Sequence, residues 1–299
     1  MWLVLVMGAA VTNTGSAQGC GRSWPLCNGQ FVPEFTVETA IEYSHRAVTG
    51  VEGVLIVALA AALLGRWRGL REVQILVPLM LGSLALQAGL GAAAVMMPQS
   101  PAVLASHFGI SLVAFASTFL ASGVVFEQTS HRPGEPPAVR QPVPPAVRAS
   151  VLAIGAWVLV VVYLGAYLRH AGVSLACPDW PLCTGQVIPA LYGPTGVAFA
   201  HRVAALAAVL ALAWLAVRTR DLPGLGPVAL AAAGLAVLQA LSGALVVSTR
   251  LGLFSTLGHA GVMALLFAAL ALLTRRVLTA APRYTYNPQR GTEVIRITS

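Results

Sequence analysis

Long apolar runs alternate with short polar segments along the whole chain. Runs of about 20 residues, the length that crosses a bilayer as a helix, start near positions 42, 74, 102, 149, 197, 226 and 253. A shorter run covers residues 1–12 and would rise about 18 Å as a helix, against a hydrocarbon core of about 30 Å. No basic residue precedes this run, which argues against a signal peptide. The pattern therefore predicts eight transmembrane helices, of which the first is either short or begins upstream of residue 1.

The composition excludes a water-soluble domain. Only 9% of the residues are charged and 57% are hydrophobic, whereas a soluble domain carries about 25% charged residues. A disordered chain, a coiled coil and a small secreted domain are excluded on the same grounds. Because the apolar runs are long, helices are expected rather than a barrel. The predicted fold class is an all-α polytopic membrane protein.

The net charge of +8 reflects membrane topology rather than nucleic-acid binding. All 18 basic residues are arginines, and most lie in short segments between apolar runs. Thirteen fall on one side of the predicted membrane: Arg66, Arg68, Arg71, Arg132, Arg140, Arg148, Arg218, Arg220, Arg275, Arg276, Arg283, Arg290 and Arg296. The opposite side has Arg22 and Arg250 in its loops. The positive-inside rule then places both termini in the cytoplasm.

A proline-rich segment divides the chain. Residues 127–148 contain six prolines and are predicted to form an extended cytoplasmic linker. The linker separates an N-terminal half, 1–126, from a C-terminal half, 149–276, and residues 277–299 form a cytoplasmic tail. Each half contains four predicted spans.

The two halves repeat one plan. Trp-Pro-Leu-Cys followed by Gly-Gln occurs at 24–30 and again at 180–186. In each half a histidine follows the last cysteine by 18 positions, and a second histidine follows a Leu-Gln-Ala motif, 20 positions after its glutamine. The helices of the halves enter in the same order, so the repeats are parallel. The expected architecture is two pseudo-symmetric four-helix bundles.

Four histidines lie a turn or two inside the outer ends of even-numbered spans: His45, His107, His201 and His259. An ionisable side chain at this depth is costly and normally faces the bundle interior with a partner. Two imidazoles at one depth in each half suit the axial ligands of a haem. Hydrogen bonds to Gln87 and Gln239 are the simpler alternative, and zinc is disfavoured because no cysteine or carboxylate joins them. His131 and His170 receive no assignment.

One carboxylate distinguishes the halves. Glu42 precedes His45 by three positions and shares its helix face, whereas Ala198 stands at the matching place. Near a porphyrin edge, a carboxylate can position water, accept a proton or stabilise positive charge. This assigns chemistry to the first half and a supporting haem to the second. The alternative is a plain ion pair with Arg46. Glu52 has no assigned role.

The remaining polar residues near the outer surface are two arginines and four cysteines. Arg46 and Arg202 are candidates for haem propionate contacts or for lipid headgroup contacts. Cys20 and Cys27 bracket one outer loop, and Cys177 and Cys183 bracket its counterpart. Thiols on the oxidising side form disulfides, so two bonds are expected. They either tether the loops or exchange during catalysis or haem transfer.

Six segments together resemble bacterial haem A synthases: 19–22, 24–27, 42–46, 107–111, 175–178 and 181–183. The resemblance covers nearly the whole chain and implies a multi-pass protein of the bacterial cell membrane with extracytoplasmic Cys loops. It implies that haem O is the substrate, near His45 and His107, and that its C8 methyl is oxidised twice, through an alcohol, to a formyl group.

The resemblance also implies roles for the other residues. Glu42 matches the catalytic carboxylate, and His201 and His259 match the ligands of haem b, which passes electrons away. Haem O synthase and an electron acceptor are the implied partners, and the product serves an aa3-type terminal oxidase. A bis-haem electron carrier, a membrane thiol oxidase and a haem transporter are the rival hypotheses.

Overall fold

The computed structural model describes residues 1–97, 99–130 and 142–279, and the backbone of 284–285 and 295–296. Eight helices cover most of these residues: α1 (Trp2–Asn13), α2 (Val37–Trp67), α3 (Arg71–Met96), α4 (Pro101–Ser130), α5 (Pro145–His170), α6 (Gly193–Thr219), α7 (Gly226–Ser248) and α8 (Leu253–Leu278). Seven are long and apolar enough to span a membrane, and α1 is a shorter apolar helix. The all-helical membrane class is confirmed.

The helices begin up to five residues before the predicted apolar runs, because their first turns contain polar residues. At the start of α2, the Thr36 hydroxyl accepts a hydrogen bond from the Thr39 N–H at 3.2 Å, a capping contact that hydropathy does not detect. The helices also extend into both ends of the segment predicted as the linker, 127–148, whose domain bounds stay a prediction. α4 continues to Ser130, and Pro145 occupies the first turn of α5, where proline is favoured.

The ends of the chain add two findings. Two short strands, β1 (Tyr284–Thr285) and β2 (Ile295–Arg296), pair antiparallel within the predicted tail, which the sequence pattern did not indicate. His131, the linker arginines Arg132 and Arg140, and Arg283 and Arg290 of the tail lie outside the described residues. Their predicted positions stay predictions.

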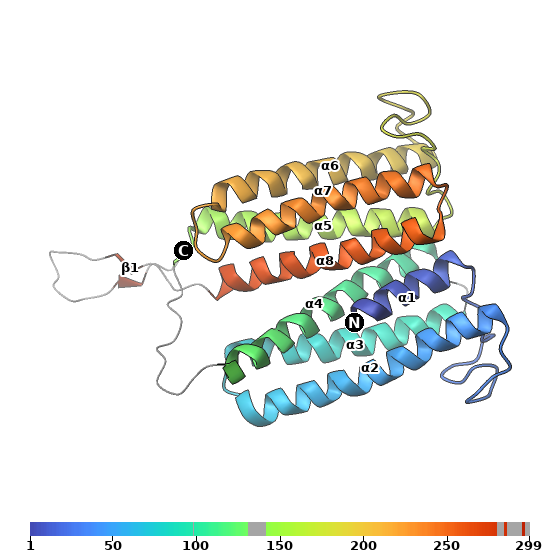
Figure 1. Ribbon diagram of the computed structural model, residues 1–299, viewed down its shortest axis with the longest axis horizontal. Coiled ribbons are helices and arrows are strands. Elements are labelled where there is room, and N and C mark those ends of the chain that lie inside the picture. The colour runs from blue at the N-terminus through green and yellow to red at the C-terminus, as the bar shows by residue number, and fades with distance from the viewer. Residues whose placement is uncertain (98, 131–141, 280–283, 286–294, 297–299) are drawn as a thin grey trace.

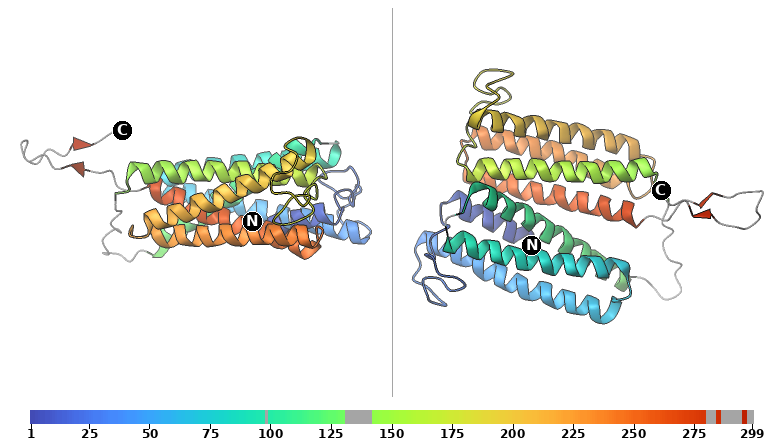
Figure 2. Two further views of the ribbon diagram at one scale, coloured as in Figure 1. Left: turned by 90° about the horizontal axis from the view of Figure 1, so that it is seen from above. Right: turned by 180° about the vertical axis from the view of Figure 1, so that it is seen from behind.

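The helices lie in two groups, α1–α4 and α5–α8, as the opposite views of Figures 1 and 2 both show. In the second group each helix contacts two others in the cyclic order α5, α6, α7, α8. The backbones of the two groups approach each other where α4 meets α5 and α8 and where α1 meets α8. The connections from α1 to α2 and from α5 to α6 lie at the same end of the molecule (Figure 1).

Hydrogen bonds join the short helix α1 to the second group. The Trp2 indole donates to the Gly261 carbonyl of α8 at 3.1 Å. At the other end of α1, the Arg169 guanidinium of α5 donates to the Asn13 side chain at 2.9 Å and to the Thr12 carbonyl at 3.2 Å. The first helix is thus anchored to both α5 and α8.

Apolar residues form the interior and also cover the outer faces. One buried cluster joins α5–α8 to α1 and α4 through residues such as Leu112, Leu212 and Leu273. A second, around Leu63 and Met80, lies between α2, α3 and α4. Large apolar side chains are also exposed along the helices, as expected for surfaces that face lipid rather than water.

An ion-pair cluster at the end opposite the Cys loops ties the two groups together. Arg275 of α8 donates to Glu127 of α4 through two nitrogens, each at 2.6 Å, and to Glu72 of α3 at 2.7 Å. The Arg275 side chain is only 10% exposed. A guanidinium that bridges two carboxylates in a partly buried place is worth more than a surface pair.

Arg275→Ala is expected to destabilise the protein by about 2 kcal/mol, because two nearby carboxylates lose a shared counter-charge. Arg220→Ala is the matched control, since Arg220 pairs with Asp221 at 3.1 Å with both side chains more than 70% exposed. The control should change stability by less than about 0.5 kcal/mol. Thermal unfolding in detergent measures both. Equal shifts for the two variants would contradict the bridging role.

Candidate functional site: histidine pairs beneath two disulfide loops

Both cysteine pairs are disulfide-bonded, and the two Cys loops share one backbone design. Cys20 is joined to Cys27, and Cys177 to Cys183. In each loop the last cysteine pairs with the glutamine three residues on through two backbone hydrogen bonds of 2.9–3.1 Å. The residues between them, Asn28-Gly29 and Thr184-Gly185, all have positive φ, as a tight two-residue hairpin requires. In both loops the peptide bond of the Trp-Pro pair, Trp24-Pro25 or Trp180-Pro181, is cis.

The first loop is seated on the start of α2. The Thr39 hydroxyl donates to the Gly19 carbonyl at 2.8 Å. A side chain on Gly19 would lie 2.4 Å from the Glu38 carbonyl oxygen, so only glycine permits this approach. The neighbouring residue, Cys20, is thereby brought over the first turns of the helix.

Glu42 is buried beneath this loop and its two carboxylate oxygens have different partners. Oε2 accepts a hydrogen bond from the Cys20 backbone N–H at 2.8 Å, and Oε1 accepts from Arg46 Nη2 at 2.6 Å. The i,i+4 ion pair that the sequence offered as the simpler interpretation therefore exists. The contact with Cys20 adds a link to the disulfide that the sequence did not predict. In the second half Ala198 is buried at the equivalent place.

Arg46 and Arg202 hold the Cys loops. Arg46 Nη1 donates to the carbonyls of Ser23 and Leu26 at 2.8 and 2.9 Å. Arg202 Nη1 donates to the Leu182 carbonyl at 2.8 Å, and its Nη2 donates to the Cys177 carbonyl at 2.7 Å. Loop binding is thus a third role, beside the predicted propionate and lipid contacts, which stay predictions. A guanidinium has five N–H donors, so these bonds leave donors for another partner.

The four histidines lie at two matched depths. His45 and His201 each stand eight residues after the first residue of α2 and α6. His107 and His259 each stand six residues after the first residue of α4 and α8. His107 lies close enough to His45 to interact with it electrostatically, and His259 interacts in the same way with His201. The two histidines of each half thus lie within electrostatic range of each other, and their role as ligand pairs stays a prediction.

The members of a pair come from helices that are not sequence neighbours. In the second group, the backbones of α6 and α8 are not close neighbours within the described helices, while α5 and α7 each lie beside both. In the first group, α3 likewise contacts both α2 and α4. His201 and His259 are therefore carried by opposite helices of the α5–α8 ring, the usual position for cofactor ligands in a helical bundle.

Each imidazole lies against a glycine of the preceding helix. A side chain on Gly165 of α5 would lie 2.8 Å from His201 Cε1, and one on Gly243 of α7 would lie 3.3 Å from His259 Cε1. In the first half the corresponding distances are 3.3 Å from Gly8 to His45 and 3.7 Å from Gly91 to His107. The glycines give the rings room that a methyl group would fill.

The sequence matches the model of a family described as cytochrome oxidase assembly protein, COX15-CtaA, over residues 1–271. The chain belongs to this family. The resemblance seen in the sequence is confirmed. Together with the seven long apolar helices and the bacterial relatives, the family identifies a multi-pass bacterial membrane protein.

Similar members of the family are named haem A synthase. The chain is 40% identical over 281 residues to the protein of Symbiobacterium thermophilum, a match that covers 91% of this chain and 90% of that protein. It is 38% identical over 281 residues to the one from Halalkalibacterium halodurans, covering 91% and 92%. It is 41% identical over 279 residues to the one from Bacillus licheniformis, covering 90% of each.

The residues present fit the haem chemistry implied by the COX15-CtaA family. The Nδ1 atoms of His45, His107 and His201 are buried and have no hydrogen-bond partner within the described ranges. The His201 ring does interact with the backbone of Val161 on α5. Two imidazoles within electrostatic range of each other in each half, each beside a glycine of the preceding helix, suit two axial ligands of one iron. No group of three or more His, Cys, Asp or Glu side chains that could hold a bare metal ion occurs among the described residues.

Hydrogen bonds to the repeated glutamines, Gln87 and Gln239, were the alternative explanation for the histidines, and these bonds differ between the halves. Gln239 Nε2 lies 3.1 Å from His259 Nε2. Gln87 donates to the Ser111 hydroxyl instead of to His107. The simpler explanation thus applies to one histidine of the four.

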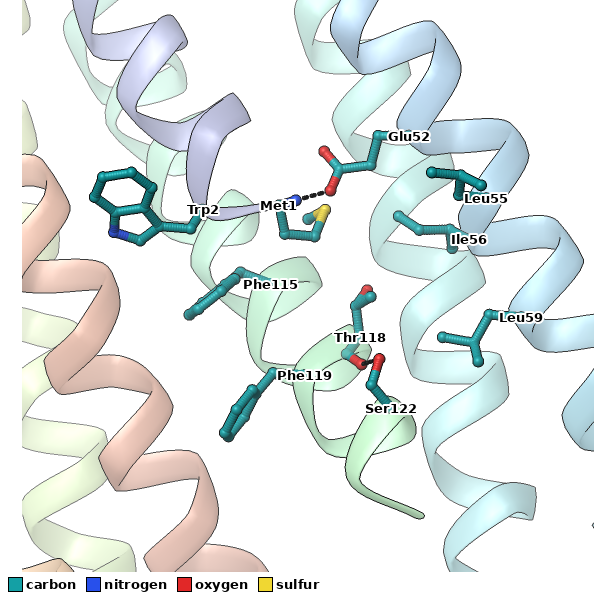
Figure 3. Close-up of a pocket in the computed structure, with 10 residues that line it drawn as sticks. All are labelled: Met1, Trp2, Glu52, Leu55, Ile56, Leu59, Phe115, Thr118, Phe119 and Ser122. Atoms are coloured by element: carbon teal, nitrogen blue, oxygen red, sulfur yellow. Dashed lines mark hydrogen bonds and ion pairs between the residues drawn. The ribbon is translucent and has the colours of Figure 1, made fainter. Parts of the chain in front are cut away.

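A pocket of about 350 Å³ lies deeper in the first half, among α1, α2 and α4 (Figure 3). It is lined by residues 52–59 of α2 and 115–122 of α4, one turn or more beyond His45 and His107 along the same helices. Glu52, which had no assigned role, lies in its wall and forms an ion pair with the Met1 α-amino group (Figure 3). The pocket contains none of the four histidines.

Sequence reasoning missed several residues of the site. The Asn28-Gly29 hairpin was detectable, because Asn-Gly between strand-like residues is the strongest short hairpin signal. Gly165, and Ser242 with its hydroxyl oxygen 2.8 Å from His259 Nδ1, had no distinguishing signal, since small residues are ordinary in membrane helices. His170 also gains a location, because it lies within electrostatic range of His107 although α5 belongs to the other half.

Proposed function

We propose that this protein is a haem A synthase that oxidises the C8 methyl group of haem O to the formyl group of haem A. The observation that carries the proposal is the position of Glu42. A buried carboxylate is held by Cys20 and Arg46 beside the histidine pair of the first half, and Ala198 replaces it in the second. Both halves contain a histidine pair, but only the first also contains an acid at this position. This difference distinguishes a reaction site in the first half from a supporting site in the second.

The proposed architecture is two pseudo-symmetric four-helix bundles. The repeated loops, the matched histidine depths and the grouping of the helices support it, with α1 counted as the eighth span. In the proposed topology both termini are cytoplasmic and the Cys loops are extracytoplasmic. Disulfides at one end and an excess of arginines at the other support this orientation.

In the reaction site, His45 and His107 hold the iron of haem O, so that the macrocycle lies beneath the first Cys loop. Glu42 positions a water molecule and accepts protons as the methyl carbon is oxidised, first to the alcohol and then to a gem-diol. Loss of water from the gem-diol leaves the formyl group. Overall, one methyl group and one water give one formyl group, four protons and four electrons.

In the supporting site, His201 and His259 hold haem b. When bound, haem b accepts single electrons and passes them to an electron acceptor outside the chain. Arg46 and Arg202 keep the loops closed over the two sites, and their remaining N–H donors can reach a propionate. The proposed partners are a haem O synthase, which supplies the substrate, and the aa3-type oxidase that receives haem A.

Pigment extraction tests the proposal. Cells that make haem O but no haem A are supplied with this protein, and their haems are separated by chromatography. Haem A is expected only when the protein is present. Folded, haem-loaded protein without any formyl haem would exclude the synthase and favour the bis-haem carrier. Loss of activity on Cys→Ser change, with full activity after His→Ala change, would favour the thiol oxidase.

A further inference from the structure

His259 differs from the other three histidines in the partner of its Nδ1 atom. Ser242 Oγ of α7 lies 2.8 Å from His259 Nδ1. The Nδ1 atoms of His45, His107 and His201 are buried without a hydrogen-bond partner in the described part of the chain. One ligand candidate of the four therefore has a side chain that supports it from behind.

The hydrogen bonds around Ser242 determine which nitrogen of His259 carries the proton. The Ser242 hydroxyl donates to the Gln239 carbonyl at 2.8 Å, so its oxygen is left to accept from His259 Nδ1–H. Nε2 then keeps its lone pair, and the Gln239 amide nitrogen lies 3.1 Å from it. This assignment follows from the network. It is the tautomer in which Nε2 can bind iron.

The first half lacks this support. Ser242 precedes His259 by 17 positions, and the residue 17 positions before His107 is Leu90. A leucine side chain has no acceptor. Ser111, the partner of Gln87, donates its own hydroxyl to the His107 backbone carbonyl at 3.0 Å, which leaves the imidazole untouched. The halves thus share the glutamine and the histidine but not the serine.

We propose that Ser242 is a positioning residue that makes His259 a permanent haem ligand, and that Leu90 leaves His107 an exchangeable one. A hydrogen bond accepted from Nδ1–H makes Nε2 more basic and fixes the ring orientation. A resident cofactor needs such a ligand. A site that takes up a substrate haem and releases a product haem needs a ligand that dissociates readily from iron. This inference rests on the proposed function.

The experiment uses the full-length protein in detergent. Ser242→Ala is expected to lose haem b to excess apomyoglobin about tenfold faster than the unchanged protein. Its haem b should also have a more positive midpoint potential, because a less basic ligand stabilises ferric iron less well. Ser242→Thr retains a hydroxyl and should restore both values. Ser248→Ala is the matched control, since Ser248 lies on the same helix, exposed, and donates only to the Ala244 carbonyl.

Leu90→Ser is the reciprocal variant. It offers His107 the acceptor that it lacks, and is expected to slow the release of haem from the first half several-fold. Washed protein loaded with haem O, followed by chromatography of the retained haem, measures this release. If Ser242→Ala is too unstable to purify, Ser242→Val and Leu90→Ser provide the same comparison.

The outcomes separate the inference from the proposed function. Unchanged haem loss and potential in Ser242→Ala would overturn the role of Ser242 while the unchanged protein still binds haem and forms haem A. Unchanged release from Leu90→Ser would overturn the role of Leu90. If the unchanged protein holds no haem that depends on His259, as tested by His259→Ala, the proposed function fails and the inference fails with it.

Discussion

Glu42→Gln is expected to lower the formation of haem A by about 10²–10⁴-fold, the usual contribution of a positioned acid or base. The amide oxygen of glutamine can still accept the hydrogen bond from the Cys20 N–H, which is 2.8 Å from the carboxylate in the structure. The negative charge and the ability to take a proton are lost. Chromatography of the extracted pigments should show haem O or the alcohol intermediate in place of haem A.

Glu38→Gln is the control for this variant. Glu38 lies one turn earlier on the same helix, its side chain is exposed, and it should tolerate the change without effect. The haem b spectrum should stay normal in both variants, because His201 and His259 lie in the other half. Normal haem A production by Glu42→Gln would reduce Glu42 to an anchor for Arg46 and the Cys loop.

Gly165→Ala is expected to remove most of the haem from the second half. The added methyl carbon would lie 2.8 Å from His201 Cε1 and 3.3 Å from its Nε2, closer than atoms in contact can approach. The ring must turn or the helices must separate, and either movement displaces the proposed iron ligand, His201. Alanine is a better helix former than glycine by about 1 kcal/mol, so weakened helix formation cannot explain the loss.

Gly155→Ala on the same helix is the matched control. Apart from the adjacent residues and backbone of its own helix, no atom of the described residues lies within 4 Å of the position that its side chain would take. Haem content per protein, measured by the pyridine haemochrome method, should fall at least tenfold in Gly165→Ala and stay unchanged in Gly155→Ala. An equal haem content in the two variants would show that the ring does not lie against Gly165 in the loaded protein.

The features that sequence predicts here are those governed by length and by repetition. A run of about 20 apolar residues has few alternatives to a membrane helix, so the seven long helices were found within a few residues of their starts. The histidine pairs were found because each occurs twice at one spacing. Without its counterpart in the other half, His259 would have been indistinguishable from a histidine whose only role is a structural hydrogen bond to Gln239.

The features that sequence missed depend on where a group points. Arg46 has the same surroundings in the sequence whether it binds a propionate, a lipid headgroup or the carbonyls of Ser23 and Leu26. Gly165 looks like any other small residue of a membrane helix until the His201 ring is placed beside it. Arg275 reads as one of several arginines at a helix end, and its partners, Glu72 and Glu127, are more than 140 positions away.

The bonds that close the Cys loops bear on the route a ligand takes into the protein. Each loop is closed by a disulfide and is hydrogen-bonded to an arginine of the helix beneath it. These bonds oppose any opening of the loop away from the histidines. A tetrapyrrole with a long isoprenoid tail dissolves in the bilayer and not in water. If the proposed function holds, haem O would therefore reach His45 and His107 from the side, out of the bilayer, and haem A would leave by the same lateral route.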